Sequence, residues 1–294
     1  MFDVCVIGHL TQDIVIARNV ERKMPGGTAY YSSIALKRLG ANVCVVTKTA
    51  KGDIGLLNDL ISNSITIFYK ESQETTIFKN IYPKGPNFRL QEIKSIAQSF
   101  KPSDIPNIST HFFHLGPLTK KDISIEILRL LSKKAKISLD VQGFVRKIDK
   151  DKVKGSDWEE KEEGLTYINV LKASETEAKI LSGENAVKKA AIKLSTYGID
   201  EIIITCGRSG SLIYSKGKFY PIPYFLPRKI VDTTGCGDTY IAAYIHKHLK
   251  SRNINEAGRF AAATAALKTE SFGPFKEDEK SVQKFINYSP PIHF

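Results

Sequence analysis

Residues 232–238 read Asp232-Thr233-Thr234-Gly235-Cys236-Gly237-Asp238, and the rest of the chain is organised around this stretch. The residues behind it recur at helical spacing and predict a helix that begins near Cys236: Tyr240, Ile241, Tyr244, Ile245, His248 and Leu249. The first N–H groups of a helix are unpaired and its dipole adds roughly half a positive charge there, so the glycine turn can hold an anion. An anion site beside a carboxylate, here Asp238, suits phosphoryl transfer, in which the carboxylate takes a proton from the attacking hydroxyl.

The same seven residues could instead form an ordinary strand–helix turn with an acidic helix start. The full string DTTGCGD, however, closely resembles the C-terminal signature of the ribokinase-like (PfkB) carbohydrate kinases, usually written DTTGAGD. By this resemblance Gly235, Cys236 and Gly237 form the anion hole and Asp238 is the catalytic base. The resemblance also makes Asp232 a candidate ligand of a monovalent cation such as K⁺, as in some relatives.

The N-terminal part carries a second likeness to that family. Residues 26–55 (GGTAYYSSIALKRLGANVCVVTKTAKGDIG) resemble its N-terminal signature, with a glycine pair, a helix and a following GDxxG turn. Paired glycines at a helix start let the backbone approach a polyol closely. The resemblance implies that Asp13, Gly26 and Gly27 hold the acceptor, and Tyr31 stands where the family usually has Asn.

Two β-rich runs, Thr66 to Tyr69 and Thr75 to Tyr82, are separated by a polar turn and predict a hairpin. Together with Ile14 to Ala17 they predict a small sheet, which in this family covers the sugar site and excludes water. The alternative is a continuation of the main sheet. We favour a lid formed by segments near 11–24 and 65–90, because these strands interrupt an alternating βα order. A homodimer, if one forms, is expected through the lid.

Strand and helix patterns alternate again from His111 onward. The strand Ile137 to Asp140 ends in DVQGFVR (140–146), and polar residues just past a strand's C-terminal end are where open α/β sheets bind ligands. Gln142 and Arg146 are therefore candidate acceptor-binding residues, although a lone Arg is more often a surface residue. The DVQGFVR string looks like that of inositol-kinase-like members of the family.

Residues 173–183 (ASETEAKILSG) follow another strand and match the family's NxxE region, with Ser174 in place of the usual Asn. By the resemblance Glu177 places Mg²⁺ through its water shell and Ser174 borders the nucleotide. A hard cation takes oxygen ligands and keeps most of its waters, so one carboxylate beside the phosphates suffices. Without the resemblance, Glu177 is an ordinary glutamate in the first turn of a helix.

A glycine-rich loop follows the strand Glu201 to Thr205. It resembles the family's nucleotide-binding loop, TxGxxG, which places Thr205 and Gly207 beside the phosphates and allows close approach of the nucleotide at Gly210. A lone GxxG is weak evidence, and a plain turn is the alternative. Gly273 lies in the region that closes over the adenine in the family. ATP is the expected donor, although no residue here distinguishes it from other nucleotides.

The composition excludes several classes of protein. The chain has 294 residues with 42% hydrophobic content, and no window approaches the roughly 20 apolar residues of a membrane span. Its N-terminus shows no targeting pattern, so we expect a cytoplasmic protein. The formal charge is +12, but the lysines are scattered, which favours a basic surface over a nucleic-acid site.

The four cysteines show neither CxxC pairing nor metal-ligand spacing. Cys5 and Cys44 lie in apolar runs and are expected to be buried thiols. Cys236 lies at a helix start inside the proposed anion hole, where the pKa of a thiol tends to fall.

These observations predict an α/β fold: one domain over residues 1–294, a three-layer α/β/α sandwich with a mainly parallel central sheet and a small β lid. The predicted function is ATP-dependent phosphorylation of a hydroxyl of a sugar or cyclitol in the presence of Mg²⁺, with myo-inositol as the first choice of acceptor. Nucleosides, ribose and sugar phosphates are alternative acceptors, and a non-catalytic ligand-binding relative is the alternative outside the kinases. A nicotinamide-dependent dehydrogenase would need GxGxxG after the first strand, where the chain reads GHLTQD (8–13).

Overall fold

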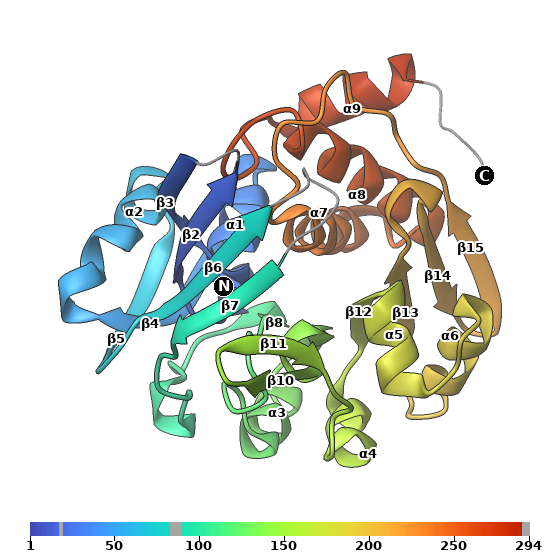
Figure 1. The fold of residues 1–294 in the computed structure, drawn as a ribbon. Coiled ribbons are helices and arrows are strands. Elements are labelled where there is room, and N and C mark those ends of the chain that lie inside the picture. Colours follow the sequence, from blue (N-terminus) through green and yellow to red (C-terminus); the bar gives the residue numbers. More distant parts are fainter. Residues whose placement is uncertain (18–19, 83–89, 290–294) are drawn as a thin grey trace.

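The computed structural model describes residues 1–17, 20–82 and 90–289, and a nine-stranded sheet forms its centre (Figure 1). In sheet order its strands are β15 (Lys218–Ile222), β14 (Ser211–Ser215), β13 (Glu201–Thr205), β12 (Val170–Ser174), β9 (Lys136–Asp140), β8 (Thr110–Leu115), β1 (Phe2–Ile7), β4 (Val43–Ala50) and β5 (Thr66–Ser72). Neighbours from β13 to β5 are parallel, and β14 and β15 join antiparallel at the other edge. The predicted mainly parallel sheet is confirmed.

Alternate residues of the strands face opposite sides of the sheet, and each side carries a layer of helices. In β1, Val4 and Val6 join one apolar core, whereas Cys5 and Ile7 join the other. All four side chains are fully buried. A strand that is buried on both faces has a continuous run of apolar residues in its sequence, which is typical of a parallel sheet between two layers of helices. The predicted α/β/α sandwich is confirmed.

The helices divide between the two faces of the sheet. On the face of Val4 lie α1 (Thr28–Arg38), α2 (Asn58–Ser62), α7 (Cys236–Ser251), α8 (Ile254–Lys268) and α9 (Glu279–Tyr288). On the face of Cys5 lie α3 (Ile125–Ser132), α4 (Lys161–Gly164), α5 (Glu175–Ser182) and α6 (Val187–Ser195). In the part of the chain that the structure describes, every helix is too short or too polar to span a bilayer.

A second sheet of six strands packs beside the main one (Figure 1). Its order is β10 (Arg146–Asp149), β11 (Lys152–Gly155), β7 (Leu90–Ser95), β6 (Thr76–Tyr82), β2 (Thr11–Ala17) and β3 (Val20–Gly26). The predicted small sheet therefore exists, with β2, β3 and β6 in it. Residues 18–19 and 83–89 of the predicted lid segments lie outside the described residues.

The predicted hairpin of residues 66–69 with 75–82 is wrong. β5 pairs in parallel with β4 at the edge of the main sheet, and only β6 enters the smaller sheet. The side chains explain this choice, because Ile67 and Tyr69 pack against one core and Phe68 packs against the other. A strand with apolar groups on both faces suits the sandwich better than a lid.

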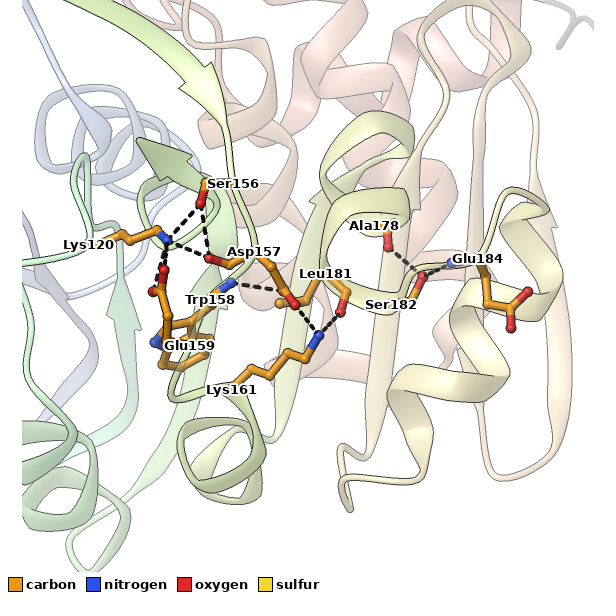
Figure 2. A network of polar contacts seen from close by, with 10 residues as sticks. All are labelled: Lys120, Ser156, Asp157, Trp158, Glu159, Lys161, Ala178, Leu181, Ser182 and Glu184. Carbon is orange, nitrogen blue, oxygen red and sulfur yellow. Dashed lines mark hydrogen bonds and ion pairs between the residues drawn. The ribbon is translucent and has the colours of Figure 1, made fainter. Parts of the chain in front are cut away.

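The chain that leaves β11 is tied to α5 by a polar network (Figure 2). Lys120 Nζ donates to the two carboxylate oxygens of Glu159 at 2.7 and 2.9 Å. Lys161 Nζ donates to Asp157 Oδ2 at 2.5 Å and to the backbone oxygen of Leu181 at 2.9 Å. The network therefore links the smaller sheet to the helix on which the predicted metal residue lies.

Candidate active site

The turn before α7 is shaped by close packing on both sides. α7 begins at Cys236, as predicted, and Gly235 precedes it in the left-handed region with φ 75°. A Cβ at Gly235 would lie 2.3 Å from the Tyr31 ring, and a Cβ at Gly237 would lie 2.9 Å from Lys172 Nζ. The start of this 16-residue helix therefore lies between an aromatic ring and a buried ammonium group.

Asp238 is the carboxylate that follows this turn. Its Oδ1 is buried and has no hydrogen-bond partner in the described part of the chain. Thr28 hydrogen-bonds its side chain, and Ser32 Oγ donates to its backbone oxygen at 3.0 Å. Burial raises the pKa of Asp238, and the charge of Lys172 opposes that rise. An oriented carboxylate with one unused oxygen has the form of a general base.

A cavity of about 200 Å³ opens in front of Asp238, and we call it the polar cavity. It brings together five of the six predicted acceptor residues with the glycine turn: Asp13, Gly27, Tyr31, Gln142 and Arg146. The sixth, Gly26, makes room for another acceptor residue, because a Cβ there would lie 2.6 Å from the Asp13 carboxylate. That carboxylate is oriented by Thr11 Oγ1, which donates to Asp13 Oδ1 at 2.7 Å.

Arg146 lies in the polar cavity, so the alternative of an ordinary surface arginine does not apply. Its Nη2 donates to Gln142 Oε1 at 2.9 Å, and Gln142 Nε2 donates to Thr28 Oγ1 at 2.9 Å. The guanidinium also lies over the ring of Phe78 in β6, 5.8 Å from the ring centroid. A continuous chain of contacts thus runs from the smaller sheet to Thr28, which holds Asp238.

Tyr31 occupies the position where sequence comparison expects Asn. It is 1% exposed, and its Oη has no hydrogen-bond partner among the described residues. Burial, followed by the charges of Asp13 and Asp232, raises the pKa of Tyr31. Two buried oxygens with unused hydrogen-bonding capacity, Tyr31 Oη and Asp238 Oδ1, therefore belong to residues that line one cavity, which suits a molecule with several hydroxyl groups.

Sequence analysis missed a charged pair between Asp140, the last residue of β9, and Lys172, in the middle of β12. Lys172 Nζ donates to Asp140 Oδ2 at 2.8 Å, and both residues line the polar cavity. Burial raises the pKa of Asp140 to about 6, although Lys172 opposes the rise. Burial alone would lower the pKa of Lys172, but the charges of Asp140 and Glu177 raise it overall. The available signal was a lysine inside an otherwise apolar strand.

The smaller sheet adds two amides that sequence analysis also missed. Gln91 Nε2 on β7 donates to Asn80 Oδ1 on β6 at 3.0 Å. Asn80 is buried, and both side chains line the polar cavity. The β-rich pattern of these segments predicts their strands, but it does not indicate that their polar side chains line a cavity.

Ser174 and Glu177 form the capping box of α5. Ser174 Oγ accepts from Glu177 N at 3.3 Å, and Glu177 Oε2 accepts from Ser174 N at 2.7 Å. Burial would raise the pKa of Glu177, but Lys172 and the Ser174 amide lower it overall. In the described ranges, no group of three or more His, Cys, Asp or Glu is placed to hold a metal ion directly.

A second cavity, of about 420 Å³, shares the residues Thr233, Cys236 and Gly237 with the first. The predicted nucleotide residues Thr205, Gly207 and Gly210 line it. Most of its other walls are apolar, and we call it the apolar cavity: Pro223, Tyr224, Phe225, Ile230, Ala262, Ala265 and Ala266. Ser174 and Gly273 are not among the described residues that line either cavity.

Cys236 differs from its prediction. Burial raises the pKa of its thiol to about 11, although the charge of Lys268 opposes the rise. Its Sγ donates to the Ala265 backbone oxygen at 3.9 Å. The predicted low pKa is wrong because burial, to which α8 contributes, has the largest effect on the pKa of this thiol.

Asp232 and Gly273 meet beside the turn. Asp232 Oδ1 accepts from Thr234 N at 2.9 Å, and Asp232 Oδ2 accepts from Gly273 N at 3.3 Å. Gly273 thus ties the loop after α8 to the loop before α7. The same carboxylate pairs with Lys268 Nζ at 3.1 Å.

Comparison with known proteins gives a consistent result. The pattern of the pfkB family carbohydrate kinases matches residues 1–280. A nucleoside kinase from Methanocaldococcus jannaschii is 24% identical over 294 residues, which cover 93% of this chain and 92% of that kinase. A pyrophosphate-dependent kinase in the ribokinase family, solved with a pyrophosphate analog and myo-inositol, has a TM-score of 0.86 and 27% identity over 96% of this chain and 99% of that one.

A more distant solved structure shares the fold alone. It is a double-mutant fructokinase from Vibrio cholerae O395 in a form with bound fructose, ADP and potassium ion. Its TM-score is 0.81 at 16% identity, over 97% of this chain and 98% of that one.

Proposed function

Since the chain belongs to the pfkB family of carbohydrate kinases, we propose that it transfers a phosphoryl group from a nucleotide to a hydroxyl of a neutral polyol, with a cyclitol such as myo-inositol as the preferred acceptor. One observation supports this most: the polar and apolar cavities meet at the glycine turn, where Asp238 Oδ1 has no partner in the described part of the chain. Transfer needs an acceptor pocket, a donor pocket and a base at one point.

The residues of the polar cavity take defined roles in this reaction. Asp13 accepts hydrogen bonds from acceptor hydroxyls, and Asp238 Oδ1 accepts the proton of the hydroxyl that attacks. The backbone N–H groups of Gly235 and Gly237 stabilise the charge of the transferred group, as oriented amides at a helix start do. Lys172 Nζ, packed beneath Gly237, adds a positive charge at the same point.

A neutral acceptor fits the polar groups of this cavity. The Asp13 carboxylate repels a phosphate, and the amides of Asn80 and Gln91 offer both donors and acceptors to a ring of hydroxyls. Arg146 would attract an anionic acceptor, but its guanidinium already contacts Gln142 and the Phe78 ring. The similar kinase that was solved with myo-inositol supports the cyclitol class.

The donor is proposed from the walls of the apolar cavity. An adenine base buries a flat apolar surface, which alanines on α8 and the rings of Tyr224 and Phe225 would cover. Pyrophosphate has no such group. It is the second candidate donor, because the similar kinase with 27% identity is pyrophosphate-dependent.

Mg²⁺ fits this site through water. Glu177 lies outside the described linings of both cavities, but its pKa is lowered by the charge of Lys172, so its carboxylate stays ionised, and a hard cation on the donor phosphates would accept such an oxygen through its water shell. The bound ion would neutralise charge on the phosphates. The proposal includes no monovalent cation, because Asp232 pairs with Lys268.

A matrix of acceptors and donors tests the proposal. Initial rates are measured for myo-inositol, ribose, cytidine and fructose 6-phosphate, each with ATP and with pyrophosphate, using Asp238→Asn protein as the blank. We expect the highest kcat/KM for myo-inositol with ATP. A preference for fructose 6-phosphate would overturn the neutral acceptor, and a preference for pyrophosphate would overturn the nucleotide donor. Salt separates the acceptor classes: at saturating donor, an anionic acceptor held by Arg146 loses kcat/KM as ionic strength rises, and a neutral acceptor does not, beyond the effect of salt on ATP that all acceptors share.

A further inference from the structure

Lys268, the last residue of α8, is a lysine with no contact with solvent. Its side chain is 0% exposed, and it is among the largest fully buried side chains of the protein. A buried ammonium group is costly unless it is paired and hydrogen-bonded. Nζ donates to the backbone oxygen of Asp232 at 3.0 Å and to Asp232 Oδ2 at 3.1 Å. Both partners belong to the first residue of the glycine-turn stretch.

The oxygens of Asp232 are the ligands that sequence comparison assigns to a monovalent cation. In the structure they are engaged by other groups. Asp232 Oδ1 accepts from Thr234 N, and Oδ2 accepts from Gly273 N as well as from Lys268. A potassium ion at these oxygens would lie against the ammonium group of Lys268, and two like charges in a buried site repel strongly. The residues present therefore do not fit K⁺.

From this disagreement we infer that Lys268 is a built-in substitute for the monovalent cation, so that phosphoryl transfer at the glycine turn does not require K⁺. The inference rests on the proposed function for its catalytic consequence and on contacts alone for the occupied cation site. Lys268 touches neither cavity and acts through Asp232, so it is a positioning residue.

The Lys268 ammonium group lies close enough to the glycine turn to affect it electrostatically. Lys268 Nζ lies 5.6 Å from the centroid of the Tyr31 ring, and that ring packs directly against Gly235. The ammonium also lies close enough to Cys236 to lower the pKa of its thiol against the effect of burial. Neutralising Asp232 removes a negative charge next to the proposed anion hole. The Asp232 carboxylate, which Lys268 and Gly273 both contact, also connects the loop before α7 to the loop after α8.

The first test compares cations on the wild-type protein. Rates and Tm are measured in the chlorides of potassium, sodium, ammonium and choline at one ionic strength, so that general screening is constant. We expect rates that agree within about twofold and a Tm that does not depend on the cation, since a ligand that binds only the folded state would raise Tm. Activation or a rise in Tm that is specific to potassium would overturn the inference.

The second test removes the internal cation. Lys268→Ala leaves the Asp232 oxygens with space beside them, and we expect its rate in choline to fall at least tenfold, with partial recovery in potassium, ammonium or propylamine. Lys268→Met is the matched control, because its side chain fills the space without a charge and should leave no room for rescue. A Lys268→Ala enzyme that is fully active in choline, or that no cation rescues although it is folded, would contradict the inference.

These measurements separate two kinds of failure. If no acceptor and donor pair gives turnover, the proposed function is wrong, but Tm still reports cation binding. The inference then requires that potassium raises the Tm of Lys268→Ala protein and leaves that of wild type unchanged. If Lys268→Ala does not fold, the wild-type comparison of cations still decides the matter.

Discussion

The polar cavity measures about 200 Å³ and is surrounded by charged and amide groups, whereas the apolar cavity measures about 420 Å³ and is walled mainly by alanines and aromatic rings. They share Thr233, Cys236 and Gly237. The polar cavity contains a buried ion pair, Lys172 with Asp140, in which each charge compensates the other. The walls of the apolar cavity offer a ligand many weak van der Waals contacts, and each of these is largely independent of the others.

This difference predicts how substitutions in the two regions behave. In a buried charge network, removing one member leaves its partner uncompensated, so effects are large and coupled. In an apolar pocket, each change of shape alters one set of contacts by a modest amount. Substitutions in the polar cavity should therefore change kcat by orders of magnitude, and those in the apolar cavity should change the KM of the donor alone.

The largest effect is expected for Asp238→Asn. The substitution keeps the shape of the side chain but removes the group that accepts the proton, so kcat should fall by roughly 10²–10⁴. The affinity for the donor should persist, because the apolar cavity and the turn amides remain. Turnover and donor binding are measured separately, by kinetics and by calorimetry. Activity within a few-fold of wild type would remove Asp238 from its role.

Lys172→Met comes next in size. It leaves the buried Asp140 carboxylate unpaired, which should lower the free energy of unfolding by about 3–5 kcal/mol. It also removes the charge beneath Gly237, which should lower kcat by about 10²-fold. The double variant Lys172→Met/Asp140→Asn is the control, since it should regain stability in denaturant titrations without regaining turnover. Recovery of both quantities together would mean that Lys172 is only structural.

The pH dependence of kcat/KM gives a smaller and graded effect. Asp238 must be ionised to act as the base, and burial raises its pKa, so kcat/KM should fall as the pH drops through that raised value, by about tenfold per pH unit. Asp140, with a pKa of about 6, becomes protonated in the same acidic range and weakens its bond to Lys172. Profiles from neutral to acidic pH at saturating donor measure this. In Lys172→Met the fall should begin at a higher pH, since Lys172 lowers the pKa of Asp238; an unchanged profile would speak against the coupling.

The sequence predicted the parts of this site that are local in the chain. The turn and the start of α7 follow from glycine spacing and a helical pattern within about twenty residues, and both are confirmed. Of the pairings between distant segments, the sequence predicted that β2 and β6 share the smaller sheet, but it did not predict two others. The partner of β5 is chosen by the cores on both faces of the strand, and Lys172 finds Asp140 only when β12 lies beside β9.

The state of Cys236 shows the same limit for electrostatics. Its position at a helix start is visible in the sequence and predicts a lowered pKa. Its burial depends on α8 and is visible only in the fold, where it raises the pKa to about 11. A prediction from one element fails where a second element supplies the larger contribution.

The smallest effect is expected from partial filling of the apolar cavity. Ala265→Leu on α8 adds three carbon atoms to the wall proposed to cover the nucleobase, at little cost in helix propensity. The KM for ATP should rise by about tenfold, while kcat and the KM for the acceptor should stay near wild type. Asn255→Leu is the matched control, since it lies exposed in the first turn of the same helix and outside the cavity. Pyrophosphate tests whether the apolar cavity binds a nucleobase. It has no nucleobase that could contact the new leucine side chain, so its KM should not change. If Ala265→Leu weakens ATP and pyrophosphate equally, the substitution disturbs the glycine turn through Cys236, and the two cavities are less independent than their walls indicate.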